Sequence, residues 1–303
     1  MARTGMLLVL ATAGCATGQP GEGAEDRPAV VVTTSIWADV VEQVACTDEI
    51  EVTTLIPNGA DTHTFELSIA DRARLDGAEL IVTNGLGLEE QLADPLDQAV
   101  GAGTPIFVIG DEVETIPYGT GSGDGPADED PHVWQDPRRV ADIVTPLARR
   151  LIDDGGLDAD AIEACAASYV AKLLATDRDI ERLVAGLPQS QRQLVTSHDS
   201  MGYFADRYGF EVIGTVLTGS AGLAESNPAE LGELISLIEE TGTRAIFVEP
   251  QHTADTANAV AEVAGGIVVA SLYTESLGPQ GSGADSYLGL VMTNATTIVG
   301  ALG

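Results

Sequence analysis

Three of the chain's four histidines, His63, His132 and His198, each follow a predicted strand or a proline-containing loop. Neutral imidazole is the commonest side-chain ligand for transition metals. If folding brings these three residues together, they form a zinc-type site. The predicted elements must therefore show whether such widely spaced side chains can meet.

Both halves of the chain alternate β-branched runs with helix-like stretches, which predicts parallel α/β sheets. The predicted strands are residues 30–34, 51–56, 79–83, 106–109, 193–196, 211–215, 245–248 and 267–270. Helices are predicted between them, for example over residues 36–44, 68–75, 228–238 and 253–264.

A long helical stretch, residues 159–187, separates the two halves. At about 1.5 Å per residue it would be on the order of 40 Å long and would restrict hinge motion. The sequence therefore predicts two lobes, each a parallel four-stranded sheet flanked by helices, joined by one long rigid helix. The expected boundaries are 29–157 for the N-terminal lobe, 158–187 for the helix and 188–303 for the C-terminal lobe.

The N-terminal segment is expected to direct export. Arg3 precedes a short apolar run and the sequence Ala-Gly-Cys15, which resembles a bacterial lipoprotein signal. Residues 1–14 would then be a signal peptide, Cys15 the lipid-modified residue, and 15–28 a flexible tether. An ordinary secretory signal or a misplaced start codon is the alternative.

Two cysteines remain, Cys46 and Cys165. An even pair in an exported chain favours a disulfide. Two unrelated buried thiols are the alternative.

The net charge is −33, from 14 basic and 47 acidic side chains. Such a chain repels the phosphates of nucleic acid, so nucleic acid is excluded as a partner. Anionic lipid is repelled too, so attachment to a membrane would need a covalent or hydrophobic anchor.

The predicted sheets also suggest where a ligand would bind. Open parallel sheets bind ligands beyond the carboxyl ends of their strands. His63 follows the strand 51–56, and His198 directly follows the strand 193–196. With His132 near the junction of the halves, these ligands would place a cation between the two lobes.

Several segments now carry a more specific resemblance. They are PNGADTHTFE (57–66), NGLGLE (84–89), DPHVW (130–134), SHDSMGYF (197–204), ESLG (275–278) and ADSY (284–287). Together they resemble the zinc- and manganese-binding solute-binding lipoproteins of bacterial ABC importers.

The resemblance implies a binding protein and not an enzyme. It implies a monomer that captures a divalent transition metal and delivers it to an ABC permease. The location would be the outer face of the cytoplasmic membrane, through a lipid anchor, or the periplasm.

The resemblance also implies the metal ligands. His63, His132 and His198 match the family's ligating histidines, and Asp285 matches its last carboxylate ligand. Three nitrogens and one oxygen suit tetrahedral Zn²⁺. Mn²⁺, the alternative metal, prefers more oxygen, and manganese-binding members often carry a glutamate where His198 stands. Metal affinity should fall below about pH 6, as the histidines protonate.

The chief alternative is a zinc hydrolase or lyase, with three histidines and a metal-bound water at an open fourth position. Asp285 discriminates between these functions, because a fourth protein ligand closes the coordination sphere. A surface adhesin of the same fold is a third alternative, which no feature of the sequence supports.

The remaining motifs predict neither a catalytic group nor a further metal ligand. The run Ser197-His198-Asp199 does not predict a hydrolase triad, because adjacent residues cannot form the geometry that a triad requires. His252 has no matching ligand role, and the loop 119–129 lacks the histidines common in zinc-binding members. Glu66 is expected either to orient His63 or to be a solvated loop carboxylate.

Overall fold

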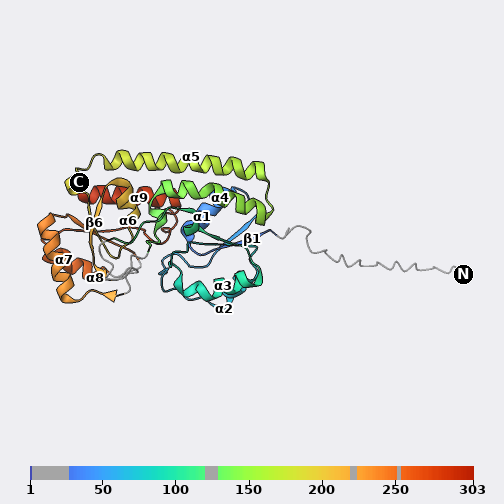
Figure 1. Ribbon diagram of the computed structural model, residues 1–303, viewed down its shortest axis with the longest axis horizontal. Coiled ribbons are helices and arrows are strands. Elements are labelled where there is room, and N and C mark those ends of the chain that lie inside the picture. The colour runs from blue at the N-terminus through green and yellow to red at the C-terminus, as the bar shows by residue number, and fades with distance from the viewer. Residues whose placement is uncertain (2–26, 120–128, 219–223, 251–253) are drawn as a thin grey trace.

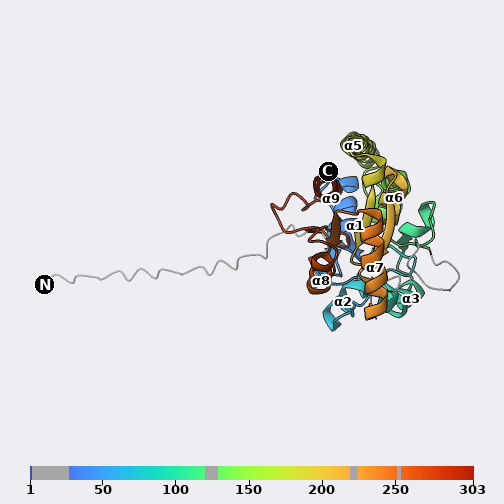
Figure 2. The ribbon, with the colours of Figure 1, turned by 90° about the vertical axis from the view of Figure 1, so that its left-hand side faces the viewer.

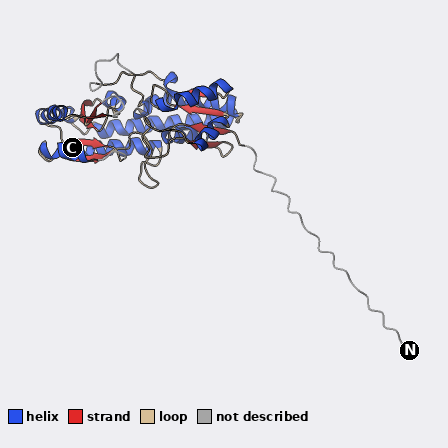
Figure 3. Ribbon diagram, turned by 90° about the horizontal axis from the view of Figure 1, so that it is seen from below, coloured by secondary structure: helices blue, strands red, loops and turns tan. Residues whose placement is uncertain are grey.

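Two parallel sheets, one from each half of the chain, form the framework of the molecule (Figures 1 and 3). The computed structural model describes Met1 and residues 27–119, 129–218, 224–250 and 254–303. The predicted signal peptide after Met1, Cys15, His252 and most of the tether and of the loop 119–129 lie outside these residues.

Each sheet has four strands, as predicted. The first has the order β2-β1-β3-β4, and the second has the order β10-β9-β5-β6. Neighbouring strands are parallel throughout both sheets. The strands are β1 Ala29–Val32, β2 Glu51–Thr54, β3 Leu80–Thr83, β4 Ile106–Val108, β5 Gln193–Thr196, β6 Glu211–Thr215, β9 Ala245–Val248 and β10 Val268–Ser271, with an antiparallel pair β7 Leu217–Thr218 and β8 Ala224–Glu225.

Helices cover both faces of each sheet. The helices are α1 Ser35–Ala45, α2 Ile69–Asp76, α3 Ala93–Ala102, α4 Pro137–Gly155, α5 Ala159–Val184, α6 Gly202–Tyr208, α7 Pro228–Thr241, α8 Asp255–Val263 and α9 Tyr287–Leu302. In the first sheet, Val31 and Ile81 pack in a core with residues of α2 and α3. Val32 and Val82 belong to the opposite core, which includes α1 and α4. This alternation follows from the two-residue period of a strand.

Helix α5 runs along one side of the whole molecule, above α4, α9 and the two sheets (Figure 1), and Figure 2 shows it almost end-on. Its 26 residues correspond to about 39 Å. Asp158 caps its first turn by accepting a hydrogen bond from Ala161 N–H. Among the described residues, no helix combines the length and the apolar character that a membrane crossing requires.

One hydrophobic core joins the two halves. It includes Trp37 of α1, Trp134, Tyr169 of α5 and Tyr287 of α9, together with residues of both sheets. The two-lobed architecture and its long connecting helix agree with the sequence analysis. The predicted boundaries at 157/158 and 187/188 stay predictions, because the shared core has no interruption at those positions.

The predicted disulfide is present between Cys46 and Cys165, whose Cα atoms are 6.1 Å apart. Cys46 directly follows α1, and Cys165 lies within α5. The bond therefore fastens the connecting helix to the N-terminal half.

Replacing both cysteines with serine is expected to lower the free energy of unfolding by about 4 kcal/mol. The bond spans a separation of 119 residues, so its loss restores a large conformational entropy to the unfolded chain. Urea denaturation of the oxidised protein and the double variant measures the difference. Reducing agent should move the transition of the native sequence alone, and coincident transitions without reductant would contradict the expectation.

Candidate metal site

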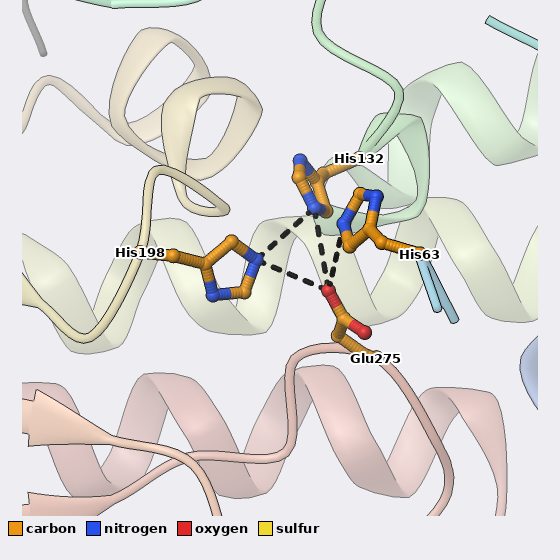
Figure 4. A group of neighbouring side chains, drawn as sticks. All are labelled: His63, His132, His198 and Glu275. Carbon is orange, nitrogen blue, oxygen red and sulfur yellow. Dashed lines mark hydrogen bonds and ion pairs between the residues drawn. The ribbon is translucent and has the colours of Figure 1, made fainter. Parts of the chain in front are cut away.

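The structure brings four buried side chains together (Figure 4). They are His63, His132, His198 and Glu275, and one ligand atom from each lies within 4.8 Å of the others. His63 is 7% exposed, and the other three are at most 2% exposed. The predicted three histidines therefore do meet.

Elements from both halves position these side chains. His63 lies in the loop between β2 and α2, and His198 comes shortly after β5. Glu275 follows β10. Since the carboxyl ends of these parallel strands open toward the same region, their loops can supply one common site. His132 directly precedes the short 3₁₀ helix Val133–Gln135, which leads into α4.

All three histidines direct Nε2 toward one oxygen of Glu275. The distances to its Oε1 are 3.2 Å from His63, 3.0 Å from His198 and 3.7 Å from His132. The Nε2 atoms of His198 and His132 are 3.4 Å apart. Three nitrogens and one oxygen thus point to a single location.

Two further carboxylates contact the Nδ1 atoms of His132 and His198, on the side of each ring opposite Nε2. His132 Nδ1 is 2.7 Å from Asp130 Oδ1, and His198 Nδ1 is 2.9 Å from Glu249 Oε1. Thr274 donates a hydrogen bond to the same Glu249 oxygen. A carboxylate at Nδ1 fixes the ring orientation and leaves the Nε2 lone pair free for a metal.

The loop that carries His63 is shaped by local hydrogen bonds. Gly59 has a φ of 80°, a left-handed conformation that suits glycine. Asp61 Oδ1 then accepts hydrogen bonds from the N–H groups of His63 (2.9 Å) and Thr64 (3.2 Å). In this turn the Asp61 side chain binds the N–H groups two and three residues further along the chain, which fixes the backbone that carries the His63 side chain.

The segment that carries His132 is supported by Asn84. Its side-chain amide donates to Pro131 O (3.0 Å), while its carbonyl accepts from Trp37 Nε1 (2.8 Å). On the other side, Trp134 Nε1 donates to Thr274 O (2.7 Å), directly before Glu275. The loops around the site are therefore tied to each other.

Charge and burial oppose each other in the pKa values of this site. Burial lowers the pKa of His132, but the charge and hydrogen bond of Asp130, with Glu275, more than offset it and raise that pKa to about 9. In the same way, Glu249 and Glu275 outweigh burial and raise the pKa of His198 well above its usual value. Burial would raise the pKa of Glu275, yet hydrogen bonds from the histidines hold it well below its usual range. Without a metal, the rings of His132 and His198 are therefore protonated at neutral pH and lie beside the ionised carboxylate of Glu275.

Asp285, which the sequence analysis expected to be the fourth metal ligand, does not belong to this group of side chains. This expectation is therefore corrected. Asp285 Oδ2 accepts a hydrogen bond from Gly281 N–H (2.8 Å), in the turn that precedes α9. It also lies near Asp39, whose pKa is raised by burial and, in smaller part, by the charge of Asp285. Glu275 takes the place that was expected for Asp285.

The roles of Asp130 and Glu249, which contact the rings of His132 and His198, were not predicted from the sequence. Glu249 directly follows β9, so the rule that ligands bind beyond strand ends could have identified it. Glu66 is exposed, which agrees with the solvated alternative. Asp199 is buried beside the site, where burial and, in smaller part, the charge of Asp130 raise its pKa.

The fold and the buried group of ligands define a metal-binding solute-binding protein of ABC importers. The chain belongs to the family described as zinc-uptake complex component A, periplasmic, whose model matches residues 30–301. It is similar to the manganese-binding lipoprotein MntA of Bacillus subtilis (strain 168), with 30% identity over 98% of this chain and 97% of the relative. It is equally similar to the zinc-binding protein TroA of Treponema pallidum (strain Nichols), with 30% identity over 95% of this chain and 92% of the relative.

The solved structures agree with this assignment. The periplasmic zinc-binding protein TroA of Treponema pallidum superimposes with a TM-score of 0.82 and 28% identity, covering 91% of this chain and 99% of the other. Since relatives are named as lipoproteins or periplasmic proteins, the predicted location outside the cytoplasmic membrane is confirmed. The hydrolase alternative finds no support in this family, which is described as a component of a zinc-uptake complex.

Proposed function

We propose that His63, His132, His198 and Glu275 bind one divalent transition metal ion, which the protein captures outside the cytoplasmic membrane and delivers to an ABC permease. The observation that carries this proposal is the convergence of three Nε2 atoms and Glu275 Oε1 on one buried location. The carboxylates at two Nδ1 atoms support it, because metal-binding histidines commonly have such partners.

The donor set favours Zn²⁺. Zinc is usually four-coordinate and accepts imidazole nitrogen together with carboxylate oxygen. Manganese prefers sites richer in oxygen. Mn²⁺ is the alternative metal, because relatives named for either metal resemble this chain to the same degree.

The closed donor set also favours a transported ion over a catalytic one. A catalytic zinc keeps an open position for water beside three protein ligands. Here the buried carboxylate of Glu275 fills the fourth position, so we infer that the metal is cargo and that the protein has no enzymatic role. Monomeric function and a lipid anchor at Cys15 complete the proposal.

Competitive titration tests the choice of metal. Protein prepared without metal should bind one equivalent of Zn²⁺ and should release bound Mn²⁺ when Zn²⁺ is added. Elemental analysis of protein purified without added metal should show zinc. Displacement of zinc by equimolar manganese would contradict the proposal for zinc, and failure to bind either ion would contradict the proposal for the site.

A further inference from the structure

The two carboxylate oxygens of Glu275 have different surroundings. Oε1 faces the three histidines, at the distances given above. Oε2 accepts a hydrogen bond from the Thr62 hydroxyl (2.6 Å) and another from Thr62 N–H (3.3 Å). Both residues are 2% exposed, so water does not compete freely for these bonds.

Thr62 is held in place independently of Glu275. It lies between Asp61 and His63, in the turn that the Asp61 side chain caps. A hydrogen bond from Gly59 N–H to Ser276 Oγ (3.1 Å) also joins the loop after β2 to the segment that carries Glu275. The loop after β2 therefore presents a fixed pair of donors to the second oxygen of Glu275.

A carboxylate can bind a metal through one oxygen or through both. To bind through both, Glu275 would have to turn Oε2 away from Thr62 and give up two buried hydrogen bonds to an ionised group. Such bonds are among the stronger ones in proteins. The contacts therefore favour binding through Oε1 alone.

We infer that Thr62 is a specificity-determining residue, which limits Glu275 to one metal–oxygen bond and so selects Zn²⁺ over Mn²⁺. The inference rests on the proposed function. With Glu275 bound through one oxygen, the protein supplies three nitrogens and one oxygen, the number that zinc favours. With both oxygens bound, the site gains the additional oxygen donor that suits manganese.

The test compares Thr62→Val, which removes the hydroxyl but keeps the shape of the side chain, with Thr62→Ser, which keeps the hydroxyl. Competitive titration gives the ratio of the Zn²⁺ and Mn²⁺ affinities for each protein. We expect this ratio to fall by about tenfold in Thr62→Val and to change little in Thr62→Ser. A change of about tenfold is at the lower end of what is usual when a residue that hydrogen-bonds to a metal ligand is replaced. Thr62→Ala should behave as Thr62→Val does, which excludes an effect of the valine methyl group.

The absorption spectrum of bound Co²⁺ supplies a second measurement, because four-coordinate cobalt absorbs visible light far more strongly than five- or six-coordinate cobalt. The native protein and Thr62→Ser should give the intense spectrum, and Thr62→Val a weaker one. An unchanged affinity ratio and an unchanged spectrum in Thr62→Val would overturn the inference. Equal loss of affinity for both metals would also overturn it, since Thr62 would then only stabilise the loop. A native protein that binds no metal would instead refute the proposed function.

Discussion

Replacing Glu275 with glutamine is expected to weaken Zn²⁺ binding by at least about hundredfold, more than the loss of an outer hydrogen-bond partner usually causes. The substitution keeps the size of the side chain but removes the negative charge nearest to the three Nε2 atoms. In a buried site, where the effective dielectric constant is low, this charge contributes strongly to the binding of a dication. Titration against a chelator of known affinity measures the change.

Asp285→Asn is the matched control for this substitution. Asp285 lies outside the group of ligands, where its carboxylate accepts a hydrogen bond from Gly281 N–H. Its replacement should leave zinc affinity unchanged. A large loss of affinity in Asp285→Asn together with unchanged affinity in Glu275→Gln would show that the structure identifies the wrong carboxylate.

Zinc binding at pH 7 is expected to release about two protons, one each from His132 and His198. The pKa of His132 is raised to about 9 and that of His198 is raised well above its usual value, so both rings carry a proton in the metal-free protein. A metal ion must displace these protons, and each one that leaves makes the apparent affinity rise about tenfold per pH unit. The affinity for zinc should therefore keep rising from pH 6 to about pH 9. With histidines of ordinary pKa, the affinity would stop rising soon above about pH 6.

Calorimetry in two buffers with different heats of ionisation counts the protons released. In Asp130→Asn the carboxylate charge beside His132 is lost, so the pKa of this ring should fall and fewer protons should be released at pH 7. Affinity that is constant from pH 7 to pH 9 would contradict this account of the site.

The sheets could be predicted from the sequence because their strands are short β-branched runs with clear ends. The predicted strands 30–34 and 245–248 correspond to β1 and β9, for example. Helix α9 was harder to recognise, because residues 287–302 contain no charged side chain and hence no polar face that marks a helical period. The core shared by both halves depends on contacts between distant segments, which no local pattern reveals.

The three histidines could be found from the sequence because their residue type, their positions after strands or loops and the motifs around them all indicated metal ligands. The carboxylate was missed because two acidic motifs follow the last strand, and the family resemblance was assigned to Asp285 in the second of them. Glu275 is nearer to the end of β10, whereas Asp285 directly precedes Ser286, the residue that caps α9. The same strand-end rule that located His198 would have favoured Glu275.

Anomalous scattering from a crystal of the zinc-loaded protein, recorded on both sides of the zinc absorption edge, tests the central claim most directly. The account predicts one peak, at about 2.0–2.2 Å from the Nε2 atoms of the three histidines and from Glu275 Oε1, with Oε2 still bound to Thr62. A peak at Asp285, or one at the histidines with a water molecule in place of Glu275, would contradict it.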